Sequence, residues 1–203
     1  MNDHETTWDL SLQIRTTGRD DTGADQYHHP YEPTPYRVLE RLADSGFFSE
    51  EDTVLDYGCG KGRVSFFLSH QTGAKAVGIE YDPRIYECAL ENRETAAAKA
   101  DFVLTGAEAY AVPPEVTRCY FFNPFSVEIL HKVLARILES WYEIPREMFL
   151  FFYYPADEYI SALMTIAELE FYDEISCEDL FAGSDPRERI LIFQLPGYDL
   201  SWR

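Results

Sequence analysis

Three glycines followed by an acidic residue form the pattern in this sequence that best suits a ligand site. Gly58, Gly60 and Gly62 stand in "VLDYGCGKG", directly after an apolar run and before a helical pattern. Glycine permits positive φ and lets the backbone approach a ligand closely, with helix N–H groups aimed at it. A dinucleotide turn would have its third glycine at position 63, which is Arg63. The spacing therefore suits a cofactor that has no pyrophosphate.

A carboxylate at the end of the next predicted strand would complete such a site. Glu80 ends "KAVGIE", where its carboxylate can accept hydrogen bonds from both hydroxyls of a ribose. Tyr81 beside it can offer a flat face to an adenine. A glycine turn alone can also serve tight packing, but the series of strand, turn, helix, strand and acid is much more specific. Together these residues predict a site for a nucleoside-type cofactor.

A second candidate for chemistry is the stretch "FFNPF", residues 121–125. Pro124 biases Asn123 toward extended geometry, so the Asn123 amide and nearby carbonyls can be held pointing into a crevice. Carbonyl oxygens of Asn123 and Pro124 would hold the hydrogens of an amine, and Phe125 could stack on a flat substrate or wall a channel. The alternative is a turn in which Asn123 and Ser126 cap the next helix.

The surrounding periodicity predicts strands that alternate with helices. Strands are expected at 53–58, 75–80, 101–106, 117–122 and 148–155, and helices at 63–73, 82–100, 126–141 and 156–169. A further helix is expected after Thr34, which would cap it, with Pro35 in its first turn and Gly46 at its end. Two last strands, 170–176 and 188–195, follow one another without a helix and are expected to be antiparallel. The pattern predicts an α/β fold with a doubly wound, mostly parallel seven-stranded sheet and a C-terminal antiparallel hairpin.

The first 30 residues are polar and rich in turn residues, so we expect a flexible N-terminal arm (1–30) before a single domain at 31–203. Apolar and polar residues alternate between Trp8 and Ile14, which is typical of a half-buried strand.

Composition restricts the kinds of partner. The chain has 17 Lys plus Arg against 36 Asp plus Glu, and the resulting net charge of −19 weighs against nucleic acid as a substrate. The four cysteines lack zinc or disulfide spacing, and His28-His29 lacks a third ligand, so we expect free thiols and no metal site. Neither a membrane span nor a signal peptide is recognisable, so we expect a soluble, cytoplasmic protein without a membrane partner.

These motifs resemble those of the class I S-adenosylmethionine-dependent methyltransferases over about residues 31–195. The matching stretches are "LDYGCGKG", "GIEYD", "LTGAEAY" and "FFNPF". That family also inserts its seventh strand antiparallel between the fifth and the sixth. The segment "YEPTPYRVL" is more loosely similar to the one preceding the fold in non-SET histone-lysine methyltransferases and their small bacterial relatives. The resemblance implies a Rossmann-like methyltransferase fold with S-adenosyl-L-methionine as cofactor.

The resemblance also implies contacts between the cofactor and particular residues of the glycine turn and of the adjoining strand ends. These are Asp56 near the amino group, Gly58, Cys59 and Gly60 along the methionine and ribose portion, and Glu80 on the ribose hydroxyls. Thr34 and Tyr36 would close over the methionine end. Many relatives have Gly-Asp-Ala after the third strand, whereas this chain has Gly106-Ala107-Glu108. The adenine amine is therefore left to Glu108 or to a backbone carbonyl.

The implied reaction is methyl transfer, for which the protein mainly supplies alignment and exclusion of water. Asn123 would end the fourth strand opposite the glycine turn and face the sulfonium methyl. We therefore expect transfer to a nitrogen of a protein or small molecule, with the acceptor and the oligomeric state left open. One alternative is a non-catalytic module that binds the cofactor or its demethylated product. A nicotinamide-dependent oxidoreductase is disfavoured by Arg63 and the final hairpin, and nucleic-acid methylation by the charge.

Overall fold

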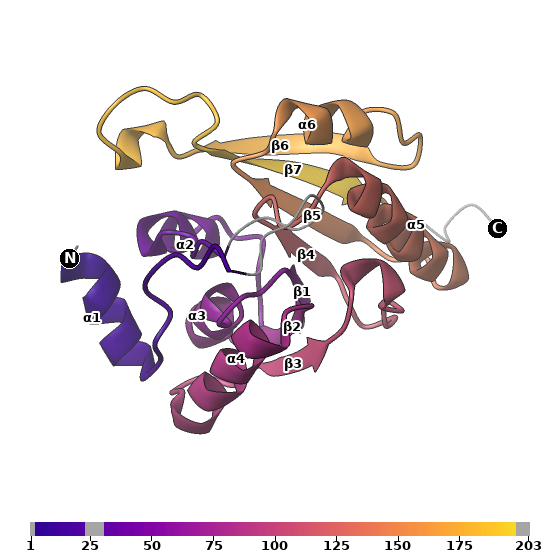
Figure 1. Ribbon diagram of the computed structural model, residues 1–203. Coiled ribbons are helices and arrows are strands. Elements are labelled where there is room, and N and C mark those ends of the chain that lie inside the picture. Colours follow the sequence, from indigo (N-terminus) through magenta and orange to yellow (C-terminus); the bar gives the residue numbers. More distant parts are fainter. Residues whose placement is uncertain (1–2, 23–30, 198–203) are drawn as a thin grey trace.

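The computed structural model describes residues 3–22 and 31–197, and one seven-stranded sheet runs through it (Figure 1). Its strands are β1 (Thr53–Tyr57), β2 (Lys75–Glu80), β3 (Asp101–Leu104), β4 (Arg118–Phe121), β5 (Met148–Tyr153), β6 (Glu170–Ser176) and β7 (Arg189–Leu195). Their order is β3-β2-β1-β4-β5-β7-β6; β1 to β5 pair in parallel, and β7 is antiparallel to both of its neighbours. The predicted α/β fold and its C-terminal hairpin are confirmed. The chain order reverses between β1 and β4, which is where ligands bind in such sheets.

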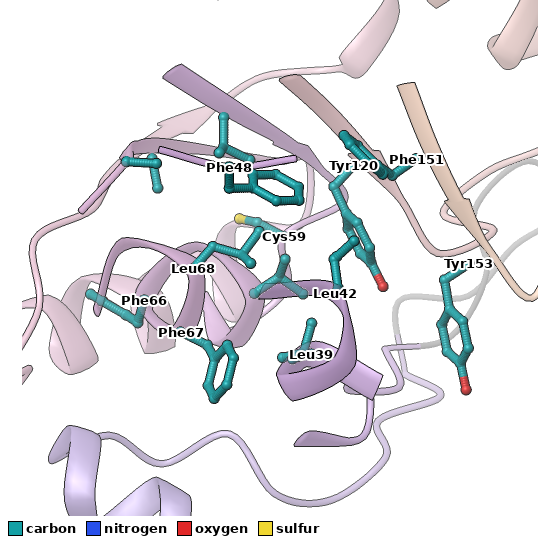
Figure 2. Close-up of a cluster of buried hydrophobic side chains, with 14 of the residues drawn as sticks. Leu39, Leu42, Phe48, Cys59, Phe66, Phe67, Leu68, Tyr120, Phe151 and Tyr153 are labelled. Carbon is teal, nitrogen blue, oxygen red and sulfur yellow. The ribbon is translucent and has the colours of Figure 1, made fainter. Parts of the chain in front are cut away.

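Helices cover both faces of the sheet. Their bounds are α2 (Tyr36–Ala43), α3 (Arg63–Thr72), α4 (Pro83–Thr95), α5 (Val127–Glu143) and α6 (Asp157–Leu163), with the short helices η1 (Ala107–Ala109) and η2 (Glu178–Leu180). One core lies under α2, α3 and α4, where Leu39, Phe67 and Tyr120 are buried (Figure 2). The other lies under α5 and α6. Both faces of β5 are thus covered, which explains its unbroken apolar sequence. Within the described residues, no helix is both long and apolar enough to span a membrane.

The strand expected near Trp8 is wrong, because Asp3–Leu12 forms helix α1. Trp8 and Leu12 lie four residues apart on one helical face, and the Trp8 ring packs against Tyr36 and Phe67. Leu10 points away and is 73% exposed. The alternation fits a strand better than a helix, so packing of Trp8 and Leu12 on α2 and α3, rather than the local pattern, decides the conformation. Over residues 3–22 the expected arm is therefore a helix and a loop packed on the domain, while the boundary at residue 31 stays a prediction.

The cap expected from Thr34 is also wrong. Helix α2 begins after Pro35 without a side-chain cap from its own segment, and the Thr34 hydroxyl instead pairs with the Tyr120 hydroxyl at 2.9 Å. The Glu5 carboxylate of α1 accepts a hydrogen bond from the Tyr36 backbone N–H at 3.0 Å. A carboxylate at a helix N-terminus is favourable, so α1 supplies the cap that the local sequence lacks.

Candidate functional site

The glycine turn connects β1 to α3 and is fixed to β2 by backbone hydrogen bonds. The N–H groups of Gly58 and Cys59 both donate to the Ile79 carbonyl at 3.0 Å. Gly58, Gly60 and Gly62 have φ values of 71°, 56° and 87°, in the left-handed region that favours glycine. The turn therefore has the backbone conformation that the spacing predicted.

Glu80 ends β2 with its carboxylate facing this turn. One oxygen accepts the Gly60 N–H at 3.0 Å, and the other accepts the N–H groups of Tyr81 and Asp82 at 2.8 and 2.9 Å. Burial raises the pKa of Glu80, and these three backbone donors oppose the shift. A carboxylate has about four acceptor positions, so Glu80 is oriented by the backbone and can still accept from a ligand hydroxyl.

Asp56 lies at the floor of the site, near the end of β1, where burial raises the pKa of its carboxyl to about 7. The Ser65 hydroxyl donates to it at 2.7 Å and opposes the shift. Because the folded pKa is raised, the contribution of Asp56 to folding stability is present below its ordinary pKa of 3.8 and is lost as the pH rises through about 7. A cation bound beside Asp56 would favour its ionised form.

Two adjoining cavities lie beyond the ends of β1, β2 and β4. The first is lined by most of the residues expected around the methionine and ribose portion of a cofactor: Thr34, Asp56, Gly58, Cys59, Gly60 and Glu80. The second is lined by those expected around an adenine, Ala107 and Glu108, together with Phe125. Gly58, Tyr81 and Pro124 line both. Because they share these three lining residues, the two cavities lie side by side, and one elongated ligand could occupy both.

Glu108 presents an unpaired acceptor to the second cavity. Its Oε2 atom is buried and has no hydrogen-bond partner among the described residues. A buried polar atom without a partner is costly, so it is a strong sign of a missing donor. The sequence left two possible acceptors for an adenine amine, the Glu108 side chain and a backbone carbonyl. The unpaired Oε2 atom favours the Glu108 side chain.

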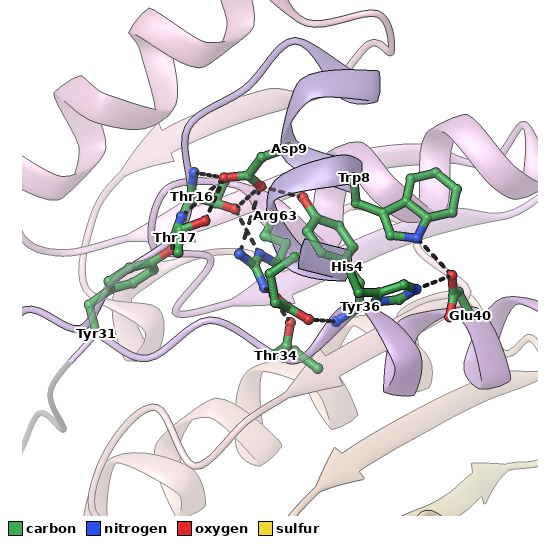
Figure 3. Close-up of polar contacts among 11 residues, drawn as sticks. His4, Trp8, Asp9, Thr16, Thr17, Tyr31, Thr34, Tyr36, Glu40 and Arg63 are labelled. Atoms are coloured by element: carbon green, nitrogen blue, oxygen red, sulfur yellow. Dashed lines mark hydrogen bonds and ion pairs between the residues drawn. The ribbon is translucent and has the colours of Figure 1, made fainter. Parts of the chain in front are cut away.

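Arg63 is the most important site residue that sequence reasoning missed. Its guanidinium donates from Nε to the Thr16 hydroxyl at 2.7 Å and from Nη1 to the Thr34 carbonyl at 3.1 Å, and Nη1 also pairs with the Glu5 carboxylate (Figure 3). Nη2 has no hydrogen-bond partner among the described residues, although Asp9 lies 3.7 Å away. Arg63 lines the first cavity. A buried guanidinium with one unused N–H edge suits a ligand carboxylate. Arg63 could have been recognised from the sequence as a charged residue at the first position of a helix whose first half is buried.

Tyr36 lies behind Arg63 and lines neither cavity. Its ring packs against the Arg63 guanidinium, 4.2 Å from ring centroid to carbon, and its hydroxyl donates to Asp9 at 2.7 Å (Figure 3). The aromatic side chain that covers the glycine turn is Tyr31, whose hydroxyl donates to the Thr16 carbonyl at 2.6 Å. A Cβ atom on Gly60 would lie 2.2 Å from the Tyr31 ring. Tyr31, which sequence reasoning passed over, therefore rests directly on the turn and lines the first cavity.

Asn123 joins the ends of β4 and β5. Its amide nitrogen donates to the Tyr154 carbonyl, and its oxygen accepts the Ala156 N–H at 3.3 Å. Asn123 has a φ of 38°, so it is not in the extended geometry expected before Pro124. Ser126 is the N-cap of α5 but makes no side-chain capping bond, so the alternative of a shared helix cap is not what is observed either.

Pro124 and Phe125 face the ligand cavities. A Cβ atom on Gly58 would lie only 2.4 Å from the Pro124 Cβ, so the glycine at this position allows Pro124 to seat against the turn. Phe125 is buried and lines the second cavity rather than an open substrate crevice. The hydroxyl of Tyr159 donates to the Phe125 carbonyl and holds this residue in place.

Sequence comparison shows that this chain is similar to known methyltransferases over part of its length. A family model described as "Methyltransferase domain" matches residues 54–146. A protein-lysine N-methyltransferase of Saccharolobus islandicus is 44% identical over 69 residues, which is 33% of this chain and 42% of that protein. A ribosomal protein L11 methyltransferase of Chromobacterium violaceum is 36% identical over 73 residues, covering 36% and 24% of the two chains. The chain thus spans less than half the length of these curated relatives.

Among solved structures, an RNA methyltransferase of Salinibacter ruber in complex with S-adenosyl-L-homocysteine superposes with a TM-score of 0.57. The match covers 84% of this chain and 97% of that one at 17% identity, which shows a shared fold. The strand order, with β7 inserted antiparallel between β5 and β6, is the one that the sequence resemblance implied. Residues 54–146 thus match a methyltransferase domain, and the chain shares its fold with a solved methyltransferase structure.

Proposed function

We propose that this protein transfers the methyl group of S-adenosylmethionine to a nitrogen atom of a protein or small molecule. The observation that carries the proposal is the position of Pro124, which packs on Gly58 and lines both cavities. Pro124 thereby borders the first cavity, in which the methionine and ribose portions of the cofactor, and the sulfonium that joins them, would lie.

The residues around the cavities fit the cofactor group by group. Nη2 of Arg63 lies 3.7 Å from Asp9 but has no hydrogen-bond partner among the described residues, so it suits the methionine carboxylate. Ionised Asp56 suits the methionine ammonium. Glu80 is oriented to accept from the ribose hydroxyls, and the unpaired Oε2 of Glu108 suits the adenine amine. Tyr81, which lines both cavities, offers an aromatic face beside the ribose and adenine.

The protein's contribution to the reaction is alignment. The cofactor brings a methyl group on a positively charged sulfur, which is a strong electrophile without further activation. Carbonyl oxygens of Asn123 and Pro124 would hold the hydrogens of the acceptor amine so that its lone pair points at the methyl group. The Asn123 side chain acts through the Tyr154 and Ala156 backbone and keeps these carbonyls in position. Such alignment contributes roughly 7 to 11 kcal/mol to lowering the barrier.

The relatives support a protein acceptor. Two of them are named for methylation of protein, one at lysine and one on ribosomal protein L11. The net charge of −19 favours a basic protein or a cationic small molecule over nucleic acid as the partner.

Cofactor binding tests the proposal first. Calorimetry should show binding of S-adenosylmethionine and none of NAD, and Glu80→Ala should weaken that binding at least about tenfold, because it removes hydrogen bonds to a charged acceptor. Glu91→Ala, an exposed charge on α4, is the matched control and should bind as the unaltered protein does. Binding of NAD instead would refute the methyltransferase proposal.

Asn123→Ala separates catalysis from cofactor binding. Turnover should fall by about tenfold or more, since misplaced backbone carbonyls no longer align the amine, while the affinity for S-adenosylmethionine should change little. Turnover is measured as the rate at which a labelled methyl group passes from S-adenosylmethionine to acceptors in a cell extract. Cofactor affinity is measured by calorimetry. Equal loss of both would mean that Asn123 merely supports the fold of the site.

A further inference from the structure

A third cavity, of about 440 Å³, lies on the other side of the Asn-Pro stretch. Its lining includes Asn123 and Glu188, and it shares Glu32 and Phe122 with the first cavity. Consecutive residues therefore face different cavities, with Asn123 lining this one and Pro124 the cofactor cavities. Its volume is within the range of small-molecule sites. The third cavity therefore adjoins the first one across the Asn-Pro stretch.

Aromatic rings form much of its wall. Phe122, Tyr153, Tyr154 and Phe181 all line it. The ring centroids of Phe122 and Tyr153 are 4.7 Å apart, and those of Phe122 and Tyr154 are 6.5 Å apart. Two of these rings already meet a guanidinium, because the Arg187 carbon lies 4.3 Å from the Tyr154 ring centroid and the Arg37 carbon 5.9 Å from that of Phe181. The rings of Phe122 and Tyr153 can pack on an apolar chain and attract a cation through their π-systems.

The charged side chains that line the third cavity include two carboxylates, Glu32 and Glu188, and one guanidinium, Arg19. The half-buried Glu188 accepts the Tyr153 hydroxyl at 2.6 Å, and no ion pair joins it to a Lys, Arg or His within residues 3–22 and 31–197. Glu32 does have a cation, Arg19 at 3.2 Å, but Arg19 is shared with Asp21 at 2.7 Å. Among the described residues, Glu188 thus lines the aromatic cavity without an ion-pair partner, an arrangement that suits a cationic ligand.

We infer that this third cavity is the acceptor subsite and that it takes an alkylammonium, a primary amine at the end of an unbranched apolar stem. The stem packs between the aromatic rings, and Glu188 attracts the charged end. The inference rests on the proposed methyl transfer and adds the chemical class of its acceptor. A lysyl side chain and a free diamine both carry this group.

The chemistry requires that the ammonium first release one proton to water. The freed lone pair on nitrogen then forms the N–C bond while the C–S bond breaks, and the sulfur keeps the electron pair of that bond. The products are the methylated ammonium and the uncharged thioether of S-adenosylhomocysteine. The role of Glu188 is to select and hold the amine, so its substitution should raise KM more than it lowers kcat.

The test compares 1-aminopentane with 1-pentanol, which has the same stem but no charge. Calorimetry with each probe, on the full chain with and without S-adenosylhomocysteine, should show the amine binding at least about tenfold more tightly. Glu188→Gln should reduce amine binding about fivefold or more and leave pentanol binding unchanged, because it keeps the shape and an acceptor for Tyr153. Glu178→Gln, an exposed change of the same charge outside the cavity lining, should bind both probes normally.

Equal affinity for amine and alcohol, no binding of either probe, or the same result for Glu188→Gln and Glu178→Gln would overturn the inference. A separate titration measures the binding of S-adenosylhomocysteine itself. If S-adenosylhomocysteine did not bind, the proposed function would be refuted instead. Labelled methyl transfer to 1,5-diaminopentane and to a lysine-containing peptide distinguishes the two sources of the amine. Transfer to neither, with cofactor binding intact, would also count against an alkylammonium acceptor.

Discussion

Replacing Arg63 by methionine is expected to lower the free energy of unfolding by about 3 to 5 kcal/mol, the usual cost of breaking a buried ion pair by removing one partner. Arg63 pairs with the Glu5 carboxylate and donates to the Thr16 hydroxyl and the Thr34 carbonyl, with a side chain only 3% exposed. Methionine has similar length but no donors, so these acceptors lose their partner inside the protein. Affinity for S-adenosylmethionine should fall at least about tenfold as well, because its carboxylate loses the Nη2 donor.

Urea unfolding followed by circular dichroism measures the first effect, and calorimetry the second. Arg93→Met is the matched control, since its ion pair with Asp101 is exposed and should be worth no more than about 1 kcal/mol. If Arg63→Met were as stable as Arg93→Met, Arg63 would not hold α1 to the domain. If stability fell but cofactor affinity did not, Nη2 would not meet the methionine carboxylate.

The elements predicted correctly are those whose pattern is set within their own segment. Helix α4 begins where the segment 82–100 was expected to begin, because the Asp82 side chain accepts the Arg84 N–H two residues away and Pro83 occupies the first turn. The strand expected at 148–155 is likewise observed as β5, whose unbroken apolar sequence suits a strand covered on both faces. The predictions for α1 and for the start of α2 were wrong because residues distant in the sequence determine both elements. Phe67 packs on Trp8 of α1, and the Glu5 carboxylate accepts the Tyr36 N–H at the start of α2.

The candidate site divides in the same way. That Gly58, Gly60 and Glu80 lie together could be predicted, because the turn after one strand and the acid at the end of the next have a characteristic spacing. Arg63 and Tyr31 could not, since their roles depend on the N-terminal segment folding back over α3 and the turn. The third cavity could not be predicted either, because it is assembled from the ends of β4 and β5 and from loops on both sides of them.

Gly58→Ala is the second substitution with a large expected effect, because it acts at the contact between the two sequence motifs. Alanine at φ 71° costs about 1 to 2 kcal/mol in backbone strain. In addition, the new Cβ would lie 2.4 Å from the Pro124 Cβ, so Pro124 must shift. The carbonyls proposed to align the acceptor amine shift with it, and a misplacement of about 1 Å can cost about a hundredfold in rate.

Gly46→Ala separates the steric effect from the strain. Gly46 has a similar φ of 83°, but a Cβ atom there would meet nothing within 4 Å. Both variants should lose similar stability to backbone strain, whereas only Gly58→Ala should lose methyl transfer, about a hundredfold. Labelled methyl incorporation at saturating cofactor measures the difference. Equal turnover of the two variants would mean that Pro124 can move without consequence, and the Asn-Pro stretch would then be part of the scaffold rather than the holder of the acceptor amine.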